Sequence, residues 1–324
     1  MIRARSQPMP KRSSGIRRNG RSTPVAVFGT GHLARTLLPL LPDAGYRPVA
    51  VCARRISAAR SACRLVPHVA ARATTCPASA IEDAVLVLLA VPDREISPLA
   101  QRLAGLPGIE WKGRVVLHHA GSAGPDLLQP LVDRGAGGAV MHPLQCLGQP
   151  EVAGDLLVGS RARIEGDRRG RPVATRLARA LGLIPLRFPA EPTQDQRSAY
   201  HAAASLLSND LVALLALGLD LMESAGVERG PALEGLASLA RGTLLQAEST
   251  GPEGALTGPV ARGDAETLRA QLESAGRVPT AAEVHRLLSL RLARLARARG
   301  SVAAARRIER ALAGMSGRSA TGTV

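Results

Sequence analysis

The sequence predicts an α/β domain with a doubly wound, parallel sheet, followed by an all-α C-terminal domain. Between residues 24 and 190, short apolar runs of β type alternate with helical stretches, which is typical of a sheet assembled from βαβ units. From about residue 192 onward, only helical patterns remain. With 324 residues, the chain is long enough for two domains.

Each expected element follows from a local pattern of apolar residues and turn residues. The strands expected in the first domain cover residues 24–28, 49–52, 84–90, 115–117, 138–141, 161–165 and 184–187. The helices expected between them cover residues 33–41, 57–66, 125–133 and 171–181. The helices expected in the second domain cover residues 196–224, 230–249, 265–274, 281–298 and 301–313. Asp264 precedes one of these helices and is its expected N-cap.

Charge is distributed unevenly along the chain. The net charge is +16, but residues 1–22 hold seven basic residues and no acid, and residues 286–324 hold nine basic residues and one acid. The remaining 26 basic and 25 acidic residues nearly cancel. Aromatic residues make up 2% of the chain, too few for the stacking platforms of single-strand binders. Nucleic acid is therefore not expected as the main ligand; binding through the basic ends is an alternative that predicts strong salt dependence.

The sequence also predicts a cytoplasmic chain. Residues 1–22 lack the apolar core of a signal peptide, and the longest apolar runs, 84–91 and 211–219, are shorter than the roughly 20 residues of a membrane span. The four cysteines form no C-x-x-C pair, as expected in a reducing compartment. Apolar runs of this length also predict no membrane association. The histidines show no tight ligand spacing, so no metal site is expected.

A glycine-rich turn follows the first expected strand and opens the first expected helix. In the segment Gly29-Thr30-Gly31-His32-Leu33-Ala34, the small residues stand as in the G-x-G-x-x-A fingerprint of dinucleotide-binding domains. The first glycine allows a tight turn, the second lets the backbone approach a pyrophosphate, and the helix N-terminus attracts its charge. The segment therefore predicts that residues 29–33 bind a dinucleotide; tight packing alone is the alternative explanation.

The second expected strand indicates which dinucleotide is bound. An NAD site needs Asp or Glu at the end of this strand to bind the ribose 2′-hydroxyl. Here Arg54 and Arg55 follow the strand, and no carboxylate occurs before Glu82. Two guanidinium groups suit the 2′-phosphate of NADP, although an arginine-rich chain also places arginines by chance. We expect NADP as the cofactor.

Several motifs together resemble a known family. Leu88-Leu-Ala-Val-Pro92-Asp93, His118-His119-Ala-Gly-Ser122, Met141-His142-Pro143 and Tyr200-His201 are similar to a bacterial family that pairs a Rossmann-like domain with a helical C-terminal domain of unknown function. The chain more distantly resembles dehydrogenases of the 6-phosphogluconate dehydrogenase and pyrroline-5-carboxylate reductase type. The resemblance implies the fold, NADP held also by Val91 and Pro92, and a homodimer formed through the helical domain.

The resulting domain plan has four parts. Residues 1–22 are expected to be a disordered basic arm, 23–190 a Rossmann-like dinucleotide-binding domain, 191–314 a helical substrate and dimerisation domain, and 315–324 a disordered tail. The boundary falls in the proline-containing segment before the first long helix. A small substrate is expected between the two domains.

Polar residues on the first long helix provide the candidate catalytic groups. His201 and Ser205 lie four residues apart on an otherwise apolar helix, with Asn209 four residues further, and such groups are costly unless they face a wet cleft or a partner. His201 is the expected general acid/base because imidazole titrates near neutral pH. Asn209 and Ser122 are expected to orient a substrate oxygen. The alternative is that His201 and Asn209 only make hydrogen bonds between helices.

Three further residues are expected to bind substrate, namely His142, Ser205 and Arg262. In the dehydrogenases that the chain resembles, the corresponding helix carries a lysine four residues before the asparagine, whereas this chain has Ser205 there and no lysine after Lys112. Two functions therefore stay open. One is an NADP-dependent oxidoreductase acting on a small carbonyl or imine, and the other is an NADP-binding sensor or scaffold without turnover.

Overall fold

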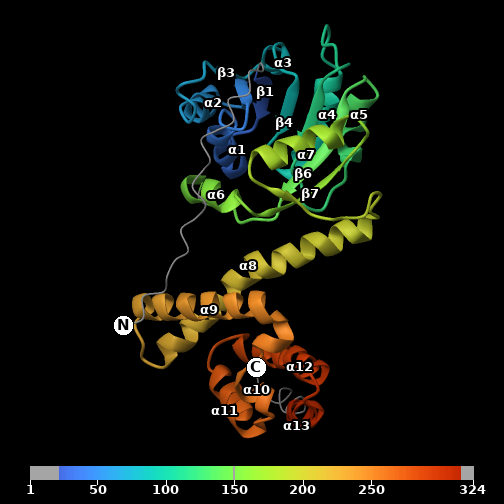
Figure 1. Cartoon of the computed structure of the whole chain (residues 1–324). Helices are drawn as coiled ribbons and strands as arrows, with labels where there is room; N and C mark the ends of the chain where they lie inside the picture. The colour runs from blue at the N-terminus through green and yellow to red at the C-terminus, as the bar shows by residue number, and fades with distance from the viewer. Residues whose placement is uncertain (1–21, 149, 315–324) are drawn as a thin grey trace, which may run out of the picture. The chain divides into compact units, whose positions relative to one another are not determined.

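The computed structural model describes residues 22–148 and 150–314 (Figure 1). The chain divides into two compact units, an N-terminal unit that ends at Ala204 and a C-terminal unit that begins at Ser205. Nearly all of the expected basic arm, 1–22, and the whole expected tail, 315–324, lie outside the described residues.

The N-terminal unit is built on one eight-stranded sheet with the strand order β3-β2-β1-β4-β5-β6-β7-β8. All neighbouring strands are parallel except β6 and β7, which run antiparallel. The order reverses beside β1, as in a doubly wound sheet, so the predicted fold class is confirmed. The strands are β1 Thr23–Phe28, β2 Tyr46–Cys52, β3 Arg72–Thr74, β4 Leu86–Leu89, β5 Val115–His118, β6 Gly137–Pro143, β7 Arg161–Gly166 and β8 Ile184–Pro185.

Helices cover both faces of this sheet. Alternate residues of β1 point to opposite faces: Val25 and Val27 belong to one apolar cluster, and Ala26 and Phe28 belong to the other. The first cluster includes side chains of α1 His32–Leu37, α2 Ile56–Cys63 and α7 Gly170–Ala180. The second includes side chains of α3 Pro77–Ile81, α4 Asp93–Ala104 and α5 Gln129–Val132. All four residues of β4 are buried, as its continuously apolar sequence predicts.

Four elements of the N-terminal unit were not among the expected ones: β3, α3, α4 and α6 Pro150–Leu157. The helix α4 contains Pro98, a residue that normally ends a helical pattern. It persists because five of its residues, Ile96, Leu99, Ala100, Leu103 and Ala104, are buried against the sheet. The expected helix over 33–41 is divided, since α1 is followed by a 3-10 turn over Leu38–Leu40.

The C-terminal unit is helical in its described part. Its helices are the later turns of α8 Gln194–Ser224, then α9 Arg229–Ala255, α10 Gly258–Arg262, α11 Ala265–Ala275, α12 Ala281–Ala298 and α13 Val302–Ala313. The expected N-cap is confirmed because the Asp264 carboxylate accepts a hydrogen bond from the Thr267 backbone N–H at 3.1 Å. A core forms where α10, α11, α12 and α13 meet, around Leu268, Ala293 and Ile308.

The long helix α8 is unusually apolar for its exposure. Its 31 residues include an 18-residue window with a mean hydropathy of 1.7, of which 6% is buried within the chain. By length and composition alone this helix could cross a membrane, although no apolar run in the sequence is that long. Exposed apolar surface of this kind is typical of interaction sites in folded proteins.

Candidate functional site

A cavity of about 560 Å³ lies at the carboxyl ends of β1, β2 and β4. Gly29, in the turn from β1 into α1, has a φ of +111°, and a Cβ atom there would lie 2.0 Å from the carbonyl oxygen of Ala90. Only glycine fits this turn. A Cβ atom on Gly31 would meet no atom within 4 Å, so the backbone faces open space, as a bound phosphate requires. The residues of the fingerprint therefore form a wall that a ligand can approach closely.

Eight of the nine predicted cofactor residues line this cavity, namely Gly29, Thr30, Gly31, His32, Leu33, Arg54, Val91 and Pro92. Arg55 is exposed at the N-cap of α2 and is not part of the lining. Arg102 of α4 lines the cavity instead, so Arg54 and Arg102 are the two guanidinium groups beside it. Arg102 was not among the predicted cofactor residues, because its helix, α4, was not expected.

His119, directly after β5, also lines the cavity. The residue is buried, and its Nδ1 lies 2.6 Å from the carbonyl oxygen of Met141 on β6. Burial lowers the pKa of His119 to about 4, although the bond to Met141 opposes this shift. The neighbouring His118 is completely buried and bonds through Nε2 to the carbonyl oxygen of Gly124. Both histidines therefore lie inside the edge of the sheet, as neutral rings at neutral pH.

A second group of rings lies at the carboxyl end of β6. His142 Nδ1 shares a hydrogen bond of 2.9 Å with the Tyr200 hydroxyl, and the His142 ring meets the His201 ring edge-on at 6.1 Å between centroids. Burial, with Arg163 and His201 adding to it, lowers the pKa of His142 to about 3. Burial raises the pKa of Tyr200 to about 12, so the pair is an uncharged donor and acceptor at neutral pH.

Gly121 explains how two histidines reach the same point. A Cβ atom on Gly121 would lie 2.2 Å from His201 Nδ1 and 2.9 Å from His142 Nε2. The two imidazoles therefore occupy the space that any other residue at position 121 would need for its side chain. The next residue, Ser122, is half-buried, and its carbonyl oxygen accepts a hydrogen bond of 2.9 Å from Gln194 at the start of α8.

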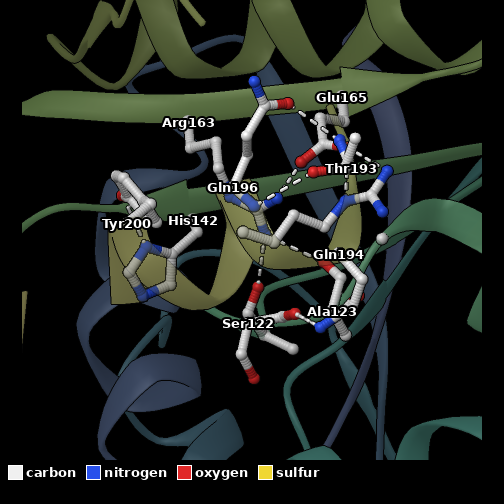
Figure 2. A network of polar contacts seen from close by, with 12 residues as sticks. Ser122, Ala123, His142, Arg163, Glu165, Thr193, Gln194, Gln196 and Tyr200 are labelled. Atoms are coloured by element: carbon white, nitrogen blue, oxygen red, sulfur yellow. Dashed lines mark hydrogen bonds and ion pairs between the residues drawn. The ribbon is translucent and has the colours of Figure 1, made fainter. Parts of the chain in front are cut away.

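A buried ion-pair network supports these rings (Figure 2). Arg163 on β7 is fully buried, pairs with Glu165, and donates from Nη2 to the carbonyl oxygens of Ala120 and Ala123, each at 2.9 Å. Arg197 of α8 pairs with the other oxygen of Glu165 through Nε and Nη2 at 2.9 and 2.8 Å. The network thus joins β7, the loop after β5 and the first turns of α8.

Arg163 also contacts the aromatic rings of the site. Its guanidinium carbon lies 5.4 Å from the centroid of the Tyr200 ring and 5.8 Å from that of Phe188. Burial lowers the pKa of Arg163 to about 10, which still leaves it charged at neutral pH. Sequence reasoning missed this residue, although Arg163 and Glu165 share one face of a strand and both interrupt its apolar pattern.

The structure brings together His142, Ser122 and His201 of the predicted site, all within the N-terminal unit. The other predicted residues belong to the C-terminal unit. Asn209 donates a hydrogen bond of 3.3 Å to Ser205 on the same helix, and Arg262 is exposed at the end of α10. Among residues 22–148 and 150–314, no group of three or more histidine, cysteine, aspartate or glutamate residues could hold a metal ion.

Two family models match the chain. Residues 8–143 match the model of a Rossmann-like domain, and residues 160–292 match that of a domain of unknown function, DUF2520. No curated protein matches.

Solved structures share the fold at low sequence identity. A protein of Thermotoga maritima is 24% identical with a TM-score of 0.62, over 85% of this chain and 99% of that one. A pyrroline-5-carboxylate reductase from Coxiella burnetii is 17% identical with a TM-score of 0.56, over 90% of this chain and 99% of that one. A reductive aminase from Aspergillus terreus, solved with NADPH and ethyl levulinate, is 19% identical with a TM-score of 0.59, over 86% of this chain and 94% of that one.

Proposed function

Because the chain joins a Rossmann-like domain to a DUF2520 domain, we propose that it is an NADP-dependent oxidoreductase that reduces a small carbonyl or imine substrate. One observation carries the proposal. His119 lines the cavity beside Gly29 and Gly31, and the ring of the neighbouring His142 contacts the rings of Tyr200 and His201 edge-on. A dinucleotide site and a cluster of polar rings thus share one edge of the sheet, where ligands bind in this fold. A pyrroline-5-carboxylate reductase and a reductive aminase among the structural relatives favour this substrate class.

The residues around the cavity fit NADP. The open space at Gly31 admits the pyrophosphate, and the Arg54 guanidinium, at the end of β2, would hold the 2′-phosphate. When bound, NADPH supplies a hydride from its nicotinamide ring. The side chains of the protein then need only hold the substrate and move one proton.

Each predicted residue has a role in this scheme. His201 would give a proton to the substrate oxygen or nitrogen as hydride reaches the neighbouring carbon. The π bond of the C=O or C=N group then breaks, one C–H bond and one O–H or N–H bond form, and the C–O or C–N single bond remains. Ser122 and Asn209 would orient the substrate, and His142, Ser205 and Arg262 would bind it.

We also propose that the chain is a cytoplasmic homodimer whose copies meet through the C-terminal unit. Helix α8 exposes Leu206, Leu207, Val212 and Leu214, and α9 exposes Leu233, Leu239, Leu244 and Leu245, each by 37–67%. Large aliphatic side chains gathered on two long helices suit the apolar core of an interface.

Oxidation of NADPH against a panel of small keto acids, ketones and cyclic imines tests the activity. We expect turnover with at least one substrate, and His201→Ala is expected to lower kcat by roughly 10²–10⁴-fold, the usual contribution of a general acid. His68→Ala, at an exposed histidine away from the site, is the matched control. Tight NADPH binding without turnover on the whole panel would contradict the enzyme and favour the sensor or scaffold function.

The choice of NADP over NAD gives a separate prediction. Arg54→Gln should weaken NADPH binding roughly 10- to 100-fold while leaving NADH binding nearly unchanged, because it removes charged hydrogen bonds to the 2′-phosphate. Arg55→Gln is the matched control, since Arg55 is not part of the lining. Titration of both cofactors by calorimetry checks this, and equal losses for NADPH and NADH would contradict the role of Arg54.

A further inference from the structure

Arg102 is a charged side chain on the face of α4 that borders the cavity. The residue is exposed, and it lines the cavity together with Glu95 and Leu99, which precede it by seven and three residues on the same helix. These spacings place the three side chains on one stripe of α4. Because Arg102 is both exposed and part of the lining, a ligand in the cavity can reach its guanidinium group.

The residue Cys52 shows where along the sheet edge Arg102 lies. Cys52 is the last residue of β2 and also lines the cavity. Burial raises the pKa of the Cys52 thiol to about 11, the nearby Cys76 adds to this, and the Arg102 guanidinium opposes it. A charge acts on a thiol in this way only from nearby, so Arg102 lies close to the end of β2. Arg54 follows that strand by two residues and lines the same cavity.

The two guanidinium groups beside the cavity are not neutralised by the protein. Neither Arg54 nor Arg102 has an ion-pair or hydrogen-bond partner in the part of the chain that the structure describes. Two carboxylates line the cavity, Asp93 and Glu95, and both lie in the first turn of α4. Glu95 pairs with Arg94 at 3.6 Å, and at 1.5 Å per residue it precedes Arg102 by about 10 Å along the helix axis. The cavity is therefore positive near the end of β2 and negative where α4 begins.

Two unpartnered guanidinium groups suit a ligand group that carries two negative charges. In a dinucleotide bound at the turn after β1, the adenosine ribose lies at the end of β2, and in NADP this ribose carries the 2′-phosphate. Resting on the proposed cofactor, we propose that Arg102 binds the 2′-phosphate from α4, while Arg54 binds it from the end of β2. Arg102 is then a second residue that selects NADP over NAD.

The two reduced cofactors isolate this contact, because NADPH and NADH differ only in the 2′-phosphate. Calorimetry on the full chain should show that Arg102→Gln weakens NADPH binding roughly tenfold and leaves NADH binding nearly unchanged, since charged hydrogen bonds to the 2′-phosphate are lost. Arg94→Gln is the matched control. It removes the same charge from the same helix, but the side chain of Arg94 is 87% exposed and is not part of the cavity lining, so both affinities should stay at the wild-type values.

Two further variants test whether the arginines share one phosphate. The double variant with Arg54→Gln and Arg102→Gln should bind NADPH and NADH almost equally, because no guanidinium group remains beside the 2′-phosphate. Arg102→Lys keeps the charge without the planar donor fork, so it should keep part of the preference for NADPH.

The outcomes separate this contact from the proposed function. Equal losses of NADPH and NADH binding in Arg102→Gln would assign Arg102 to a part that both cofactors share, and an equal loss in Arg94→Gln would reduce the effect to net charge. Either result would overturn the contact, as would unchanged binding in Arg102→Gln, while a loss of NADPH binding in Arg54→Gln would keep NADP as the cofactor. A wild-type protein that binds neither NADPH nor NADH would overturn the proposed function itself.

Discussion

At the scale of single residues, the candidate site depends on glycines, which have no side chain, as much as on the side chains that line it. Gly29 allows a backbone turn that no other residue could make against Ala90, and Gly121 leaves room for two imidazoles. In both places the constraint is contact with another part of the chain. Such a glycine makes the site sensitive to the smallest possible addition, a methyl group.

Gly121→Ala is therefore expected to disturb the rings while leaving the fold intact. The new methyl group would overlap His201 Nδ1 and His142 Nε2, and relieving such overpacking typically costs about 1–3 kcal/mol. Urea unfolding followed by the fluorescence of Trp111 measures this cost, because Trp111 is the one tryptophan of the chain and is buried in the N-terminal unit.

The control for this substitution is Gly235→Ala on α9, where a Cβ atom would meet nothing within 4 Å. In a helix, alanine is favoured over glycine, so this variant should be neutral or slightly more stable. If Gly121→Ala unfolded at the wild-type urea concentration and kept wild-type turnover, the close approach of the two histidines to Gly121 would be refuted.

The site residues differ in how far the sequence could predict them. Gly29 to Leu33 form a local motif, so their place at the cavity follows from spacing alone. Arg163, Glu165 and Arg197 have partners 32 to 43 residues away along the chain. No local pattern indicates such pairs, because they depend on which strand lies beside which helix. The one available signal was that Arg163 and Glu165 are charged residues inside a buried strand. That pattern does not indicate which residues they contact.

At the scale of elements, the Arg163–Glu165–Arg197 network holds together three segments that are distant in sequence. Glu165 accepts from an arginine on its own strand and from one on α8, and the side chain of Glu165 is 3% exposed. Two guanidinium groups thus depend on one buried carboxylate. Removing that charge would leave both of them without their ionic partner, which is costly in a buried place.

Glu165→Gln should accordingly destabilise the N-terminal unit by about 3–5 kcal/mol. Urea unfolding monitored by Trp111 fluorescence checks the value. Asp83→Asn provides a matched control, since its ion pair with Arg72 is exposed and pairs of this kind contribute about 1 kcal/mol or less. Equal, small effects in the two variants would show that the network contributes no more than a surface pair.

The expected elements were most accurate where packing and periodicity agree. The helix α12 has the expected bounds, and its buried residues Ala293 and Ala296 recur with helical spacing. The sequence did not reveal α4, because Pro98 and five charged or amide side chains interrupt its apolar pattern. The short strand β3 has three residues and only one buried side chain, too little for a sequence pattern.

At the scale of the whole molecule, composition was the least informative evidence. The net charge of +16 suggested nucleic acid, but the excess lies in the terminal segments, and the candidate site uses single arginines with defined partners. The apolar surface of the C-terminal unit escaped composition analysis as well. It depends on which leucines the helical packing leaves exposed, and only the folded arrangement of α8 and α9 determines that.

That surface yields the last prediction, the oligomeric state. If α8 and α9 meet a second copy, Leu239→Glu or Leu245→Glu places a charge in an apolar interface and should raise the dimer dissociation constant roughly a hundredfold or more. Sedimentation equilibrium on the full chain measures this. Leu156→Glu on α6, at a leucine of the N-terminal unit that is also exposed, should leave the dimer unchanged. A monomeric wild-type chain that floats with phosphatidylcholine vesicles would instead assign the apolar surface of α8 to a lipid partner, and the homodimer would then be wrong.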